Sequence, residues 1–326
     1  MATVSSAYAV VILAVVLFAG LFVSISIRYQ RDIRQARVRV SAGSLMAGTP
    51  CGPIEYAVAG DGPPVLVVHG AGGGYDQGMD IFMPLVDVGY RVIAMSRFGY
   101  LRTPLPADAS PPAQADAHAC LLDALNIRQA VVIGVSAGGP SAMQFALRHP
   151  ERTAALVLMV PAAYASRPVD VRSKRMPPGV EFLLDAVLKS DFLFWALTRF
   201  ARQTAIRTIL GTPPEVVQSA SAEERASVAQ VLDHVLPVSP RRLGLLNDAA
   251  IVTTLPRYEL ERIAAPTLIM SVADDLYGTF DGARYSAEHI PHARFVGYPS
   301  GGHMGVGHEK ETMAEIAAFL KGFSSR

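Results

Sequence analysis

The sequence is poor in cysteine, and the two cysteines that it has are widely separated. Among the 326 residues only Cys51 and Cys120 are cysteines, too few for a disulfide scaffold and without the C-x-x-C spacing of a redox or metal site. We therefore expect two ordinary buried or half-buried thiols. A single bridge between them stays open as the alternative.

Charge is also scarce, and neither sign dominates. A net charge of +1, with no basic stripe and no zinc-ligand spacing, argues against nucleic acid as a partner. Charged residues make up 17% of the chain and hydrophobic residues 51%, which is apolar for a soluble protein. This balance suggests that part of the apolar sequence belongs in lipid.

The longest stretch without charge lies near the N-terminus, at residues 7–27. As a helix this run would be about 30 Å long, enough to cross a bilayer. A cleaved signal peptide is the alternative, but no Lys or Arg precedes the run and no clear A-x-A site follows it. We expect residues 1–30 to be a single-pass anchor that contacts the membrane through residues 7–27.

The flank of this run is basic. Only Asp32 offsets a group of five arginines, namely Arg28, Arg31, Arg34, Arg37 and Arg39. Positive flanks tend to stay in the cytoplasm. The flank therefore predicts a membrane protein whose main domain lies on the cytoplasmic face.

Beyond the anchor, short apolar runs recur at the spacing of a parallel sheet. They are continuous rather than alternating, as strands buried on both faces are. Helical stretches separate several of them, notably Ala113–Leu125 and Ser141–Arg148, which indicates a doubly wound, mostly parallel α/β sheet. The predicted strands are Pro64–Val68, Tyr90–Met95, Ala130–Val135, Ala154–Val160, Pro266–Val272 and Ala293–Tyr298, preceded by a hairpin of Val38–Met46 and Ile54–Ala59.

The alternation is interrupted by a mostly helical segment, which we place at residues 162–260 as a cap between core parts 31–161 and 261–326. Its large apolar side chains could line a hydrophobic substrate pocket or merely pack on the core. We expect a helix pair that turns one face toward the pocket. The residues concerned are Phe182, Leu183, Leu184, Val187, Leu188, Phe192, Leu193, Phe194, Trp195 and Leu197.

A G-x-S-x-G motif centred on Ser136 carries the first chemical signal. The bare motif is weak, but an apolar strand precedes it and a helical pattern follows. That context is the one a nucleophile elbow requires, where the glycines permit a sharp turn that presents the serine Oγ. The alternative, an idle serine in a glycine-rich turn, is disfavoured by this context. Ser136 is therefore the expected nucleophile.

A serine hydroxyl needs a histidine base that a carboxylate orients. In elbow hydrolases both partners follow the serine, in the order Asp then His. Strand Pro266–Val272 runs into Asp274 and Asp275, and the last strand runs into a loop that ends on His303. We favour His303 as the base, and Asp275 over Asp274 as its partner. The histidines that compete with His303 are His149, His234, His289, His292 and, as the closest rival, His308.

The loop H-G-A-G-G-G at residues 69–74 follows strand Pro64–Val68 and suits backbone N–H donation to an oxyanion. We expect the two donors to be Ala71, with Gly72 as its alternative, and Ala137, the residue after the nucleophile. The endings typical of phosphate-binding and dinucleotide loops are missing. His69 is expected to shape the loop rather than to react.

The motifs HGAGGG, GVSAGG, the ADD strand end and GGH together resemble a capped member of the α/β-hydrolase superfamily over residues 38–326. The layout is similar to that of bacterial esterases, proline iminopeptidases, carbon–carbon bond hydrolases and cofactor-free haloperoxidases. Serine at the elbow departs from epoxide hydrolases and dehalogenases, which have aspartate there. The resemblance implies the α/β-hydrolase fold with a helical cap and chemistry without a cofactor or metal.

These observations predict a serine hydrolase, of the carboxylesterase class, that cleaves a small to medium apolar ester or, less favoured, an amide. A hydrolase-fold protein that only binds a hydrophobic small molecule is the main rival. A membrane-tethered scaffold is a third interpretation. A complete Ser, His and Asp set argues against both of these, because a binding module needs no such set.

Overall fold

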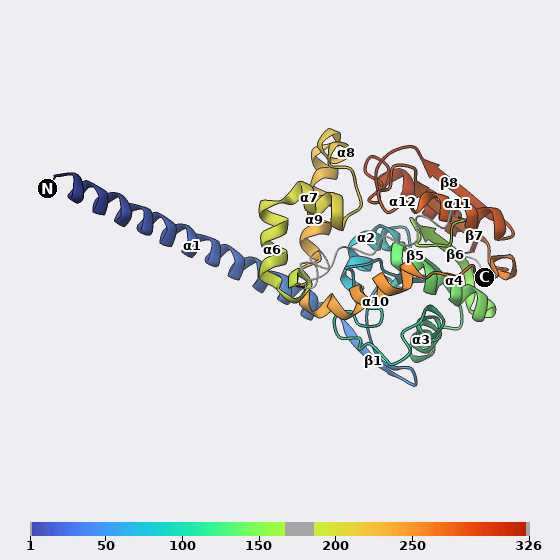
Figure 1. The fold of residues 1–326 in the computed structure, drawn as a ribbon. Helices are drawn as coiled ribbons and strands as arrows, with labels where there is room; N and C mark the ends of the chain where they lie inside the picture. The colour runs from blue at the N-terminus through green and yellow to red at the C-terminus, as the bar shows by residue number, and fades with distance from the viewer. Residues whose placement is uncertain (1, 167–185, 324–326) are drawn as a thin grey trace.

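A computed structural model describes residues 2–166 and 186–323. Its centre is an eight-stranded sheet in the order β1-β2-β4-β3-β5-β6-β7-β8 (Figure 1). The first two pairings, β1 with β2 and β2 with β4, are antiparallel. All the other neighbouring strands are parallel. The predicted doubly wound, mostly parallel sheet is therefore confirmed.

The six predicted core strands are present with ends shifted by at most one residue. They are predictable because each is a short run of Val, Leu, Ile or Ala buried on both faces; in β3, for example, four of the five residues are buried. The strands are β1 (Leu45–Thr49), β2 (Gly52–Ala59), β3 (Pro64–Val68), β4 (Arg91–Met95), β5 (Ala130–Val135), β6 (Thr153–Met159), β7 (Thr267–Val272) and β8 (Ala293–Tyr298).

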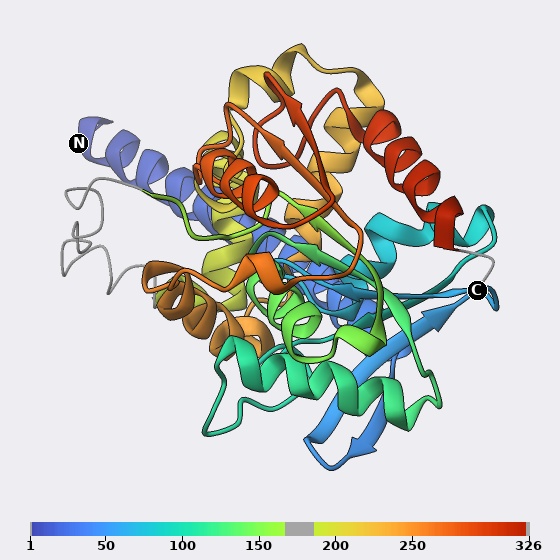
Figure 2. The same cartoon turned by 90° about the vertical axis from the view of Figure 1, so that its right-hand side faces the viewer.

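Helices cover both faces of the sheet, and further helices come between β6 and β7 in the sequence (Figures 1 and 2). Helices α3, α4 and α11 pack on one face and α2 and α12 on the other. The helices are α1 (Ala2–Ala42), α2 (Tyr75–Asp87), α3 (Pro111–Ala124), α4 (Gly139–Arg148), α6 (Asp191–Phe200), α7 (Arg202–Ile209), α8 (Pro214–Ser219), α9 (Ala222–His234), α10 (Arg242–Thr253), α11 (Phe280–His289) and α12 (Glu309–Leu320). We refer to the segment from α6 to α10 as the cap.

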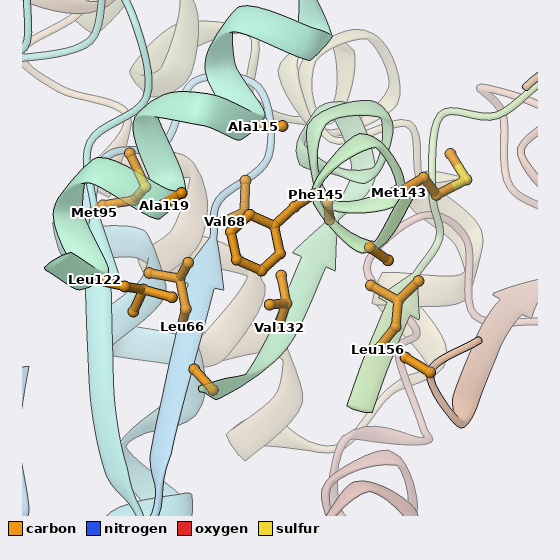
Figure 3. Close-up of a cluster of buried hydrophobic side chains, with 14 of the residues drawn as sticks. Leu66, Val68, Met95, Ala115, Ala119, Leu122, Val132, Met143, Phe145 and Leu156 are labelled. Carbon is orange, nitrogen blue, oxygen red and sulfur yellow. The ribbon is translucent and has the colours of Figure 1, made fainter. Parts of the chain in front are cut away.

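The core beneath α3 and α4 holds the central strands in place. Figure 3 shows Phe145 of α4 lying over Val132 of β5, with Leu66, Leu122 and Leu156 around them. All five of these side chains are fully buried. At about 1.5–3 kcal/mol for each such side chain, this cluster stabilises the central strands whose carboxyl ends carry the site.

The N-terminal helix α1 is longer than the predicted anchor and does not end at residue 30. It continues to Ala42, so the predicted strand at Val38–Met46 is wrong; β1 begins at Leu45. Ile25, Tyr29, Ile33 and Ala36 recur at helical spacing and pack on the cap in one hydrophobic cluster. This packed stripe outweighs the strand preference of the valines at the end of the helix.

The apolar part of α1 is long and hydrophobic enough to span a bilayer, with a mean hydropathy of 2.2 in a segment that is 0% buried. Figure 1 shows the N-terminal half of the helix projecting away from the rest of the chain. Side chains from Ile12 to Ser24 are all exposed. An exposed apolar helix of this length is a candidate transmembrane span.

The expectation of two free thiols is wrong. Cys51 and Cys120 form a disulfide that links the turn between β1 and β2 to helix α3, with their Cα atoms 6.2 Å apart. The bond pins the antiparallel edge of the sheet to the helix layer. The spacing of two cysteines 69 residues apart could not show this, because only the fold brings them together.

Candidate active site

Ser136 lies at a sharp turn between β5 and α4. Its φ of 49° is in the left-handed region, which costs energy for a residue other than glycine and is typical of strained functional sites. The motif glycines permit the turn through close packing: a Cβ on Gly134 would lie 2.6 Å from that of Ala142, and one on Gly138 would lie 2.4 Å from the carbonyl oxygen of Val68. The predicted elbow geometry is therefore present.

The structure brings Ser136, His303 and Asp275 together at the carboxyl ends of the strands. His303 Nε2 lies 2.8 Å from Ser136 Oγ, and His303 Nδ1 lies 2.8 Å from Asp275 Oδ2. With a proton on Nδ1, the ring donates to the carboxylate and accepts from the serine hydroxyl. This is the arrangement in which a histidine can act as base toward a serine.

Asp275 is the more deeply buried partner of His303. Its side chain is 0% exposed, against 11% for His303. It accepts hydrogen bonds from the Tyr277 N–H at 2.8 Å and from the Thr279 hydroxyl. Burial alone would raise the pKa of Asp275, but the hydrogen bond and electrostatic interaction with His303, together with these two donors, lower the pKa below its usual range. The carboxyl group is thus held ionised beside the imidazole.

Asp274, the alternative, takes a different part. Its two carboxylate oxygens accept from the N–H groups of Gly302, at 2.7 Å, and Gly301, at 3.3 Å. Among the contacts of the described residues, the ring of His303 bonds to Asp275 and not to Asp274. Asp274 therefore fixes the loop that carries His303, while Asp275 contacts the ring.

The predicted oxyanion donors belong to two separate segments near Ser136. Ala137 follows it in the elbow, and Ala71 lies in the loop after β3, beside Ser136 in the lining of one cavity. No hydrogen bond of either backbone N–H is found within residues 2–166 and 186–323, whereas the Gly72 N–H donates to Tyr100 at 3.4 Å. Of Ala71 and Gly72, Gly72 is thus the less available donor.

His69 shapes this loop. Its ring is buried; Nδ1 lies 2.7 Å from the Gly70 carbonyl oxygen and Nε2 lies 2.9 Å from the Arg97 backbone nitrogen. Burial, with the positive charge of Arg97, lowers the pKa of His69 well below its usual value. A neutral ring that accepts from the Arg97 N–H is a structural part of the loop, in agreement with the expected role.

The fold agrees with that of known proteins. The pattern of the family described as alpha/beta hydrolase fold matches residues 63–307, more than half of the chain. The chain belongs to the α/β-hydrolase fold family.

Individual relatives are similar over most of their length. The uncharacterized hydrolase YcgS of Bacillus subtilis (strain 168) is 29% identical over 282 residues, 83% of this chain and 95% of that protein. The 2-hydroxy-6-oxononadienedioate/2-hydroxy-6-oxononatrienedioate hydrolase of Comamonas testosteroni is 27% identical, covering 75% of this chain and 82% of that one. A solved alpha/beta hydrolase fold protein from Nakamurella multipartita has a TM-score of 0.68 and 28% identity, covering 86% of this chain and 99% of that one.

A cavity of about 1150 Å³ opens beside Ser136 and His303 of this α/β hydrolase. Its inner walls are apolar, with Val135, Met159, Val160, Met270 and Val272 at the strand ends. Toward solvent it runs between α2, α9 and α12. A mostly apolar cavity of this size with a few polar groups at one point is typical of a small-molecule site.

The cap contributes to this cavity through other residues than those predicted. Its lining residues come from α9 and from Ile209 and Leu210. Phe182, Leu183 and Leu184 lie outside the described residues. The predicted residues that are described, Val187, Leu188, Phe192, Leu193, Phe194, Trp195 and Leu197, do not line the cavity.

Several of these residues contact the anchor helix instead. Tyr29 of α1 packs edge-on against Phe192 and Trp195, at ring distances of 5.2 and 5.6 Å. Trp195 Nε1 donates to Asp32 of α1 at 3.0 Å. For the described residues of this segment the prediction of a pocket-facing side is therefore wrong, because several of them pack on the apolar surface of α1 instead.

Sequence reasoning missed the contacts that join the cap to the loops of Asp275 and His303. The Gly211 carbonyl oxygen accepts from the N–H groups of Leu276, at 3.0 Å, and His303, at 3.2 Å. The Tyr277 ring packs on His303, and its hydroxyl donates to the Ile209 carbonyl at 2.8 Å. No local signal marks residues 209–212, since their partners lie far away in sequence.

Four of the five rival histidines make contacts elsewhere. His308, the closest rival, stacks on Tyr298 and lies 3.2 Å from Glu311. His149 contacts Asp116 and His234 contacts Asp80. His289 stacks on Tyr285. Among the described contacts of these side chains, none is with Ser136.

Proposed function

We propose that this protein is a serine hydrolase that cleaves uncharged, apolar carboxylic esters through an acyl-enzyme on Ser136. The observation that carries the proposal is the position of His303, which lies 2.8 Å from Ser136 Oγ and 2.8 Å from Asp275 Oδ2 beside an apolar cavity. A protein that only binds a ligand has no use for a base so aligned with a hydroxyl.

In the proposed mechanism Ser136 Oγ attacks the ester carbonyl while His303 Nε2 takes its proton. Asp275 holds the ring by its Nδ1–H and stabilises the imidazolium. The N–H groups of Ala71 and Ala137 receive the oxyanion. His303 then protonates the leaving alcohol, and water, activated by the same base, hydrolyses the acyl-enzyme.

The direct test is turnover of a p-nitrophenyl ester together with labelling by a fluorophosphonate, which reacts quickly only with an activated serine hydroxyl. We expect both. A protein that neither labels nor turns over an ester, but still binds hydrophobic small molecules, would show that the rival binding function is the correct one.

The charges at the cavity mouth favour an uncharged substrate. The lining includes four carboxylate side chains, Asp80, Glu223, Glu224 and Glu309, and one lysine, Lys310, which pairs with Glu223 at 3.1 Å. The Comamonas relative is named for a dienedioate, which is a dianion. An acidic mouth without an unpaired cation in its described lining repels such a substrate.

We therefore predict opposite responses to chain length and to terminal charge. Each added acyl methylene should raise kcat/KM about fourfold, from roughly 0.8 kcal/mol per buried CH₂, until the cavity is filled. A p-nitrophenyl ester of adipic acid, with a free terminal carboxylate, should be at least about tenfold poorer than the hexanoate ester. Steady-state kinetics on both series measures this.

The matched variant is Glu223→Gln, which removes a mouth carboxylate and frees Lys310. This variant should narrow the difference in kcat/KM between the adipate and hexanoate esters and leave kcat/KM for the hexanoate ester unchanged. A better rate on the adipate ester in the unaltered protein would contradict the uncharged-substrate proposal and favour the carbon–carbon hydrolase alternative.

The anchor and the disulfide bear on localisation. We propose that α1 spans a membrane, and that the catalytic domain lies on the oxidising side. Disulfides persist in oxidising compartments and are rare in the cytosol. The Cys51–Cys120 bond therefore opposes the cytoplasmic orientation that the arginines suggested. Two of those arginines, Arg37 and Arg39, form ion pairs with Asp191 and Asp76. The folded domain therefore uses these two arginines whichever side of the membrane it lies on.

The redox state of the two cysteines, trapped by thiol alkylation as the cells are lysed, tests the orientation. Under denaturing, non-reducing conditions a maleimide–polyethylene glycol should not modify the chain, and after reduction it should modify two cysteines. Two modified cysteines without reduction would place the domain in the cytoplasm.

A further inference from the structure

The loop that carries the proposed oxyanion donor Ala71 is braced by a buried arginine of the cap. Arg241 Nη1 donates to the Gly73 carbonyl oxygen at 2.5 Å. The same side chain is 0% exposed and packs so closely on the loop that a Cβ on Gly74 would lie 3.0 Å from its Nη1. The position of Gly73 and Gly74, and with them the path of the loop, thus depends on where Arg241 lies.

Arg241 is in turn held by Asp76, in the first turn of α2. The two side chains form a two-point ion pair, with Nη2 to Oδ2 at 2.6 Å and Nη1 to Oδ1 at 3.0 Å. Burial would raise the pKa of Asp76, but the charges of Arg241 and of Arg39 lower it far below its usual range. A carboxylate so buried needs this positive charge around it to stay ionised.

Arg39, in the last turn of α1, is the second cation on Asp76. Its Nη1 donates to Asp76 Oδ2, and its Nη2 donates to the carbonyl oxygens of Leu236, at 2.6 Å, and His234, at 2.9 Å. The His234 carbonyl also accepts from Arg241 at 3.1 Å. Arg39 therefore fixes both the carboxylate and the cap backbone that surround Arg241.

A second link ties the same turn of α1 to the start of α2. The Tyr75 hydroxyl donates to the Arg39 carbonyl oxygen at 3.1 Å. The Tyr75 N–H donates to Ser96 Oγ, also at 3.1 Å. The backbone and the side chain of Arg39 thus both contact the residues that directly follow the oxyanion loop.

We propose that Arg39 is a positioning residue: through Asp76 and Arg241 it holds the loop 69–74 so that the Ala71 N–H points at the oxyanion. This inference rests on the proposed ester hydrolysis at Ser136. The end of the anchor helix is then a part of the catalytic domain, and α1 serves both as membrane segment and as brace of the site.

The test compares Arg39→Ala with Arg37→Ala in the full-length, detergent-solubilised protein. Arg37 is the matched control, because it lies in the same part of α1 and pairs with the cap residue Asp191 at 3.4 Å, but has no described contact with the loop or with Asp76. The readouts are kcat and KM on a p-nitrophenyl ester, affinity for a trifluoromethyl ketone, whose hemiketal oxyanion occupies the same hole, and the thermal unfolding midpoint.

For Arg39→Ala we expect kcat to fall about 30- to 100-fold with KM within about twofold, because loss of one oxyanion donor typically costs 10²- to 10³-fold and the loop is displaced rather than removed. Ketone affinity should fall by a similar factor. Arg37→Ala should change neither. Arg39→Lys keeps the charge but cannot donate to three acceptors in one plane. Its kcat and ketone affinity should therefore lie between those of Arg39→Ala and Arg37→Ala.

Unchanged kcat and ketone affinity in folded Arg39→Ala would overturn the positioning role, as would equal losses in Arg37→Ala. If Arg39→Ala does not fold, Arg39→Lys decides by the same two readouts. An unaltered protein that turns over no ester and takes up no fluorophosphonate would instead overturn the proposed function itself, and the positioning role with it.

Discussion

Replacing Ser136 by alanine is expected to lower ester hydrolysis by roughly 10⁵- to 10⁶-fold, the loss seen when the nucleophile of a serine triad is removed. The described partner of the hydroxyl is His303, at 2.8 Å, and the backbone bond from the Ala162 N–H to the Ser136 carbonyl oxygen does not depend on the side chain. The thermal unfolding midpoint should therefore change little. The measurement is kcat on the preferred p-nitrophenyl ester, with fluorophosphonate labelling of the same sample.

Two further variants make this result specific. His303→Ala should lose nearly as much, and the double variant no more than either single one, because the two residues act as a unit. Ser141→Ala is the matched control, because Ser141 lies only five residues after Ser136 in the sequence. Its buried hydroxyl donates to the Gly138 carbonyl oxygen at 3.2 Å and, among the described residues, does not contact His303. It should keep its activity within about threefold. More than a few per cent activity in Ser136→Ala would contradict the assignment of the nucleophile.

Sequence patterns predicted the sheet and the position of the site because both depend on local signals. The runs at Pro64–Val68 and Ala130–Val135 are continuous because both faces of each strand are buried, and the strands of the fold have the same bounds. The carboxyl ends of such strands meet at one edge. Residues that closely follow these ends, such as Ser136 and Asp275, are therefore expected near each other from the order of the strands and loops alone.

Contacts between distant segments could not be predicted in this way. Arg97 pairs with Asp248 across 151 residues of sequence, and Arg39 reaches Leu236 across 197. Nothing near Arg39 distinguishes it from its neighbouring arginines, so the sequence alone indicates only a topology signal for the whole group. Only the fold shows that Arg39 lies on the carboxylate of Asp76.

The expectation that the apolar face of α6 lines the pocket fails for the same reason. A helix such as α6 has an apolar face that must be covered, but its sequence does not say by what. The pocket was the nearest candidate, whereas the structure covers the face with Tyr29 and Ile33 of α1. The residues of the cap that do line the cavity, such as Ile209 and Val228, belong to less apolar segments, whose sequence gives no sign of a pocket.

The second large effect is expected from Asp275→Asn, which should lower kcat by roughly 10³- to 10⁴-fold with little change in KM. An amide at this position removes the charge that stabilises the imidazolium, and its NH₂ group can reverse the tautomer by donating to His303 Nδ1, which lies 2.8 Å from Asp275 Oδ2. Nε2 would then carry the proton and could no longer accept from Ser136. Thr279 would also lose a charged acceptor.

Asp274→Asn is the matched comparison, since it makes the same chemical change one residue away. Its carboxylate accepts from the N–H groups of Gly302 and Gly301, and the single amide oxygen can keep the shorter of these bonds, 2.7 Å in the native protein. We expect a loss of about tenfold or less, from a loosened histidine loop rather than a wrong tautomer. The comparison is made by kcat on one ester, with fluorophosphonate labelling rates as a second readout that requires the same base. If Asp274→Asn were the more damaging change, the carboxylate that orients His303 during the reaction would be Asp274, and the contact between Asp275 and the ring would not be the one that catalysis uses.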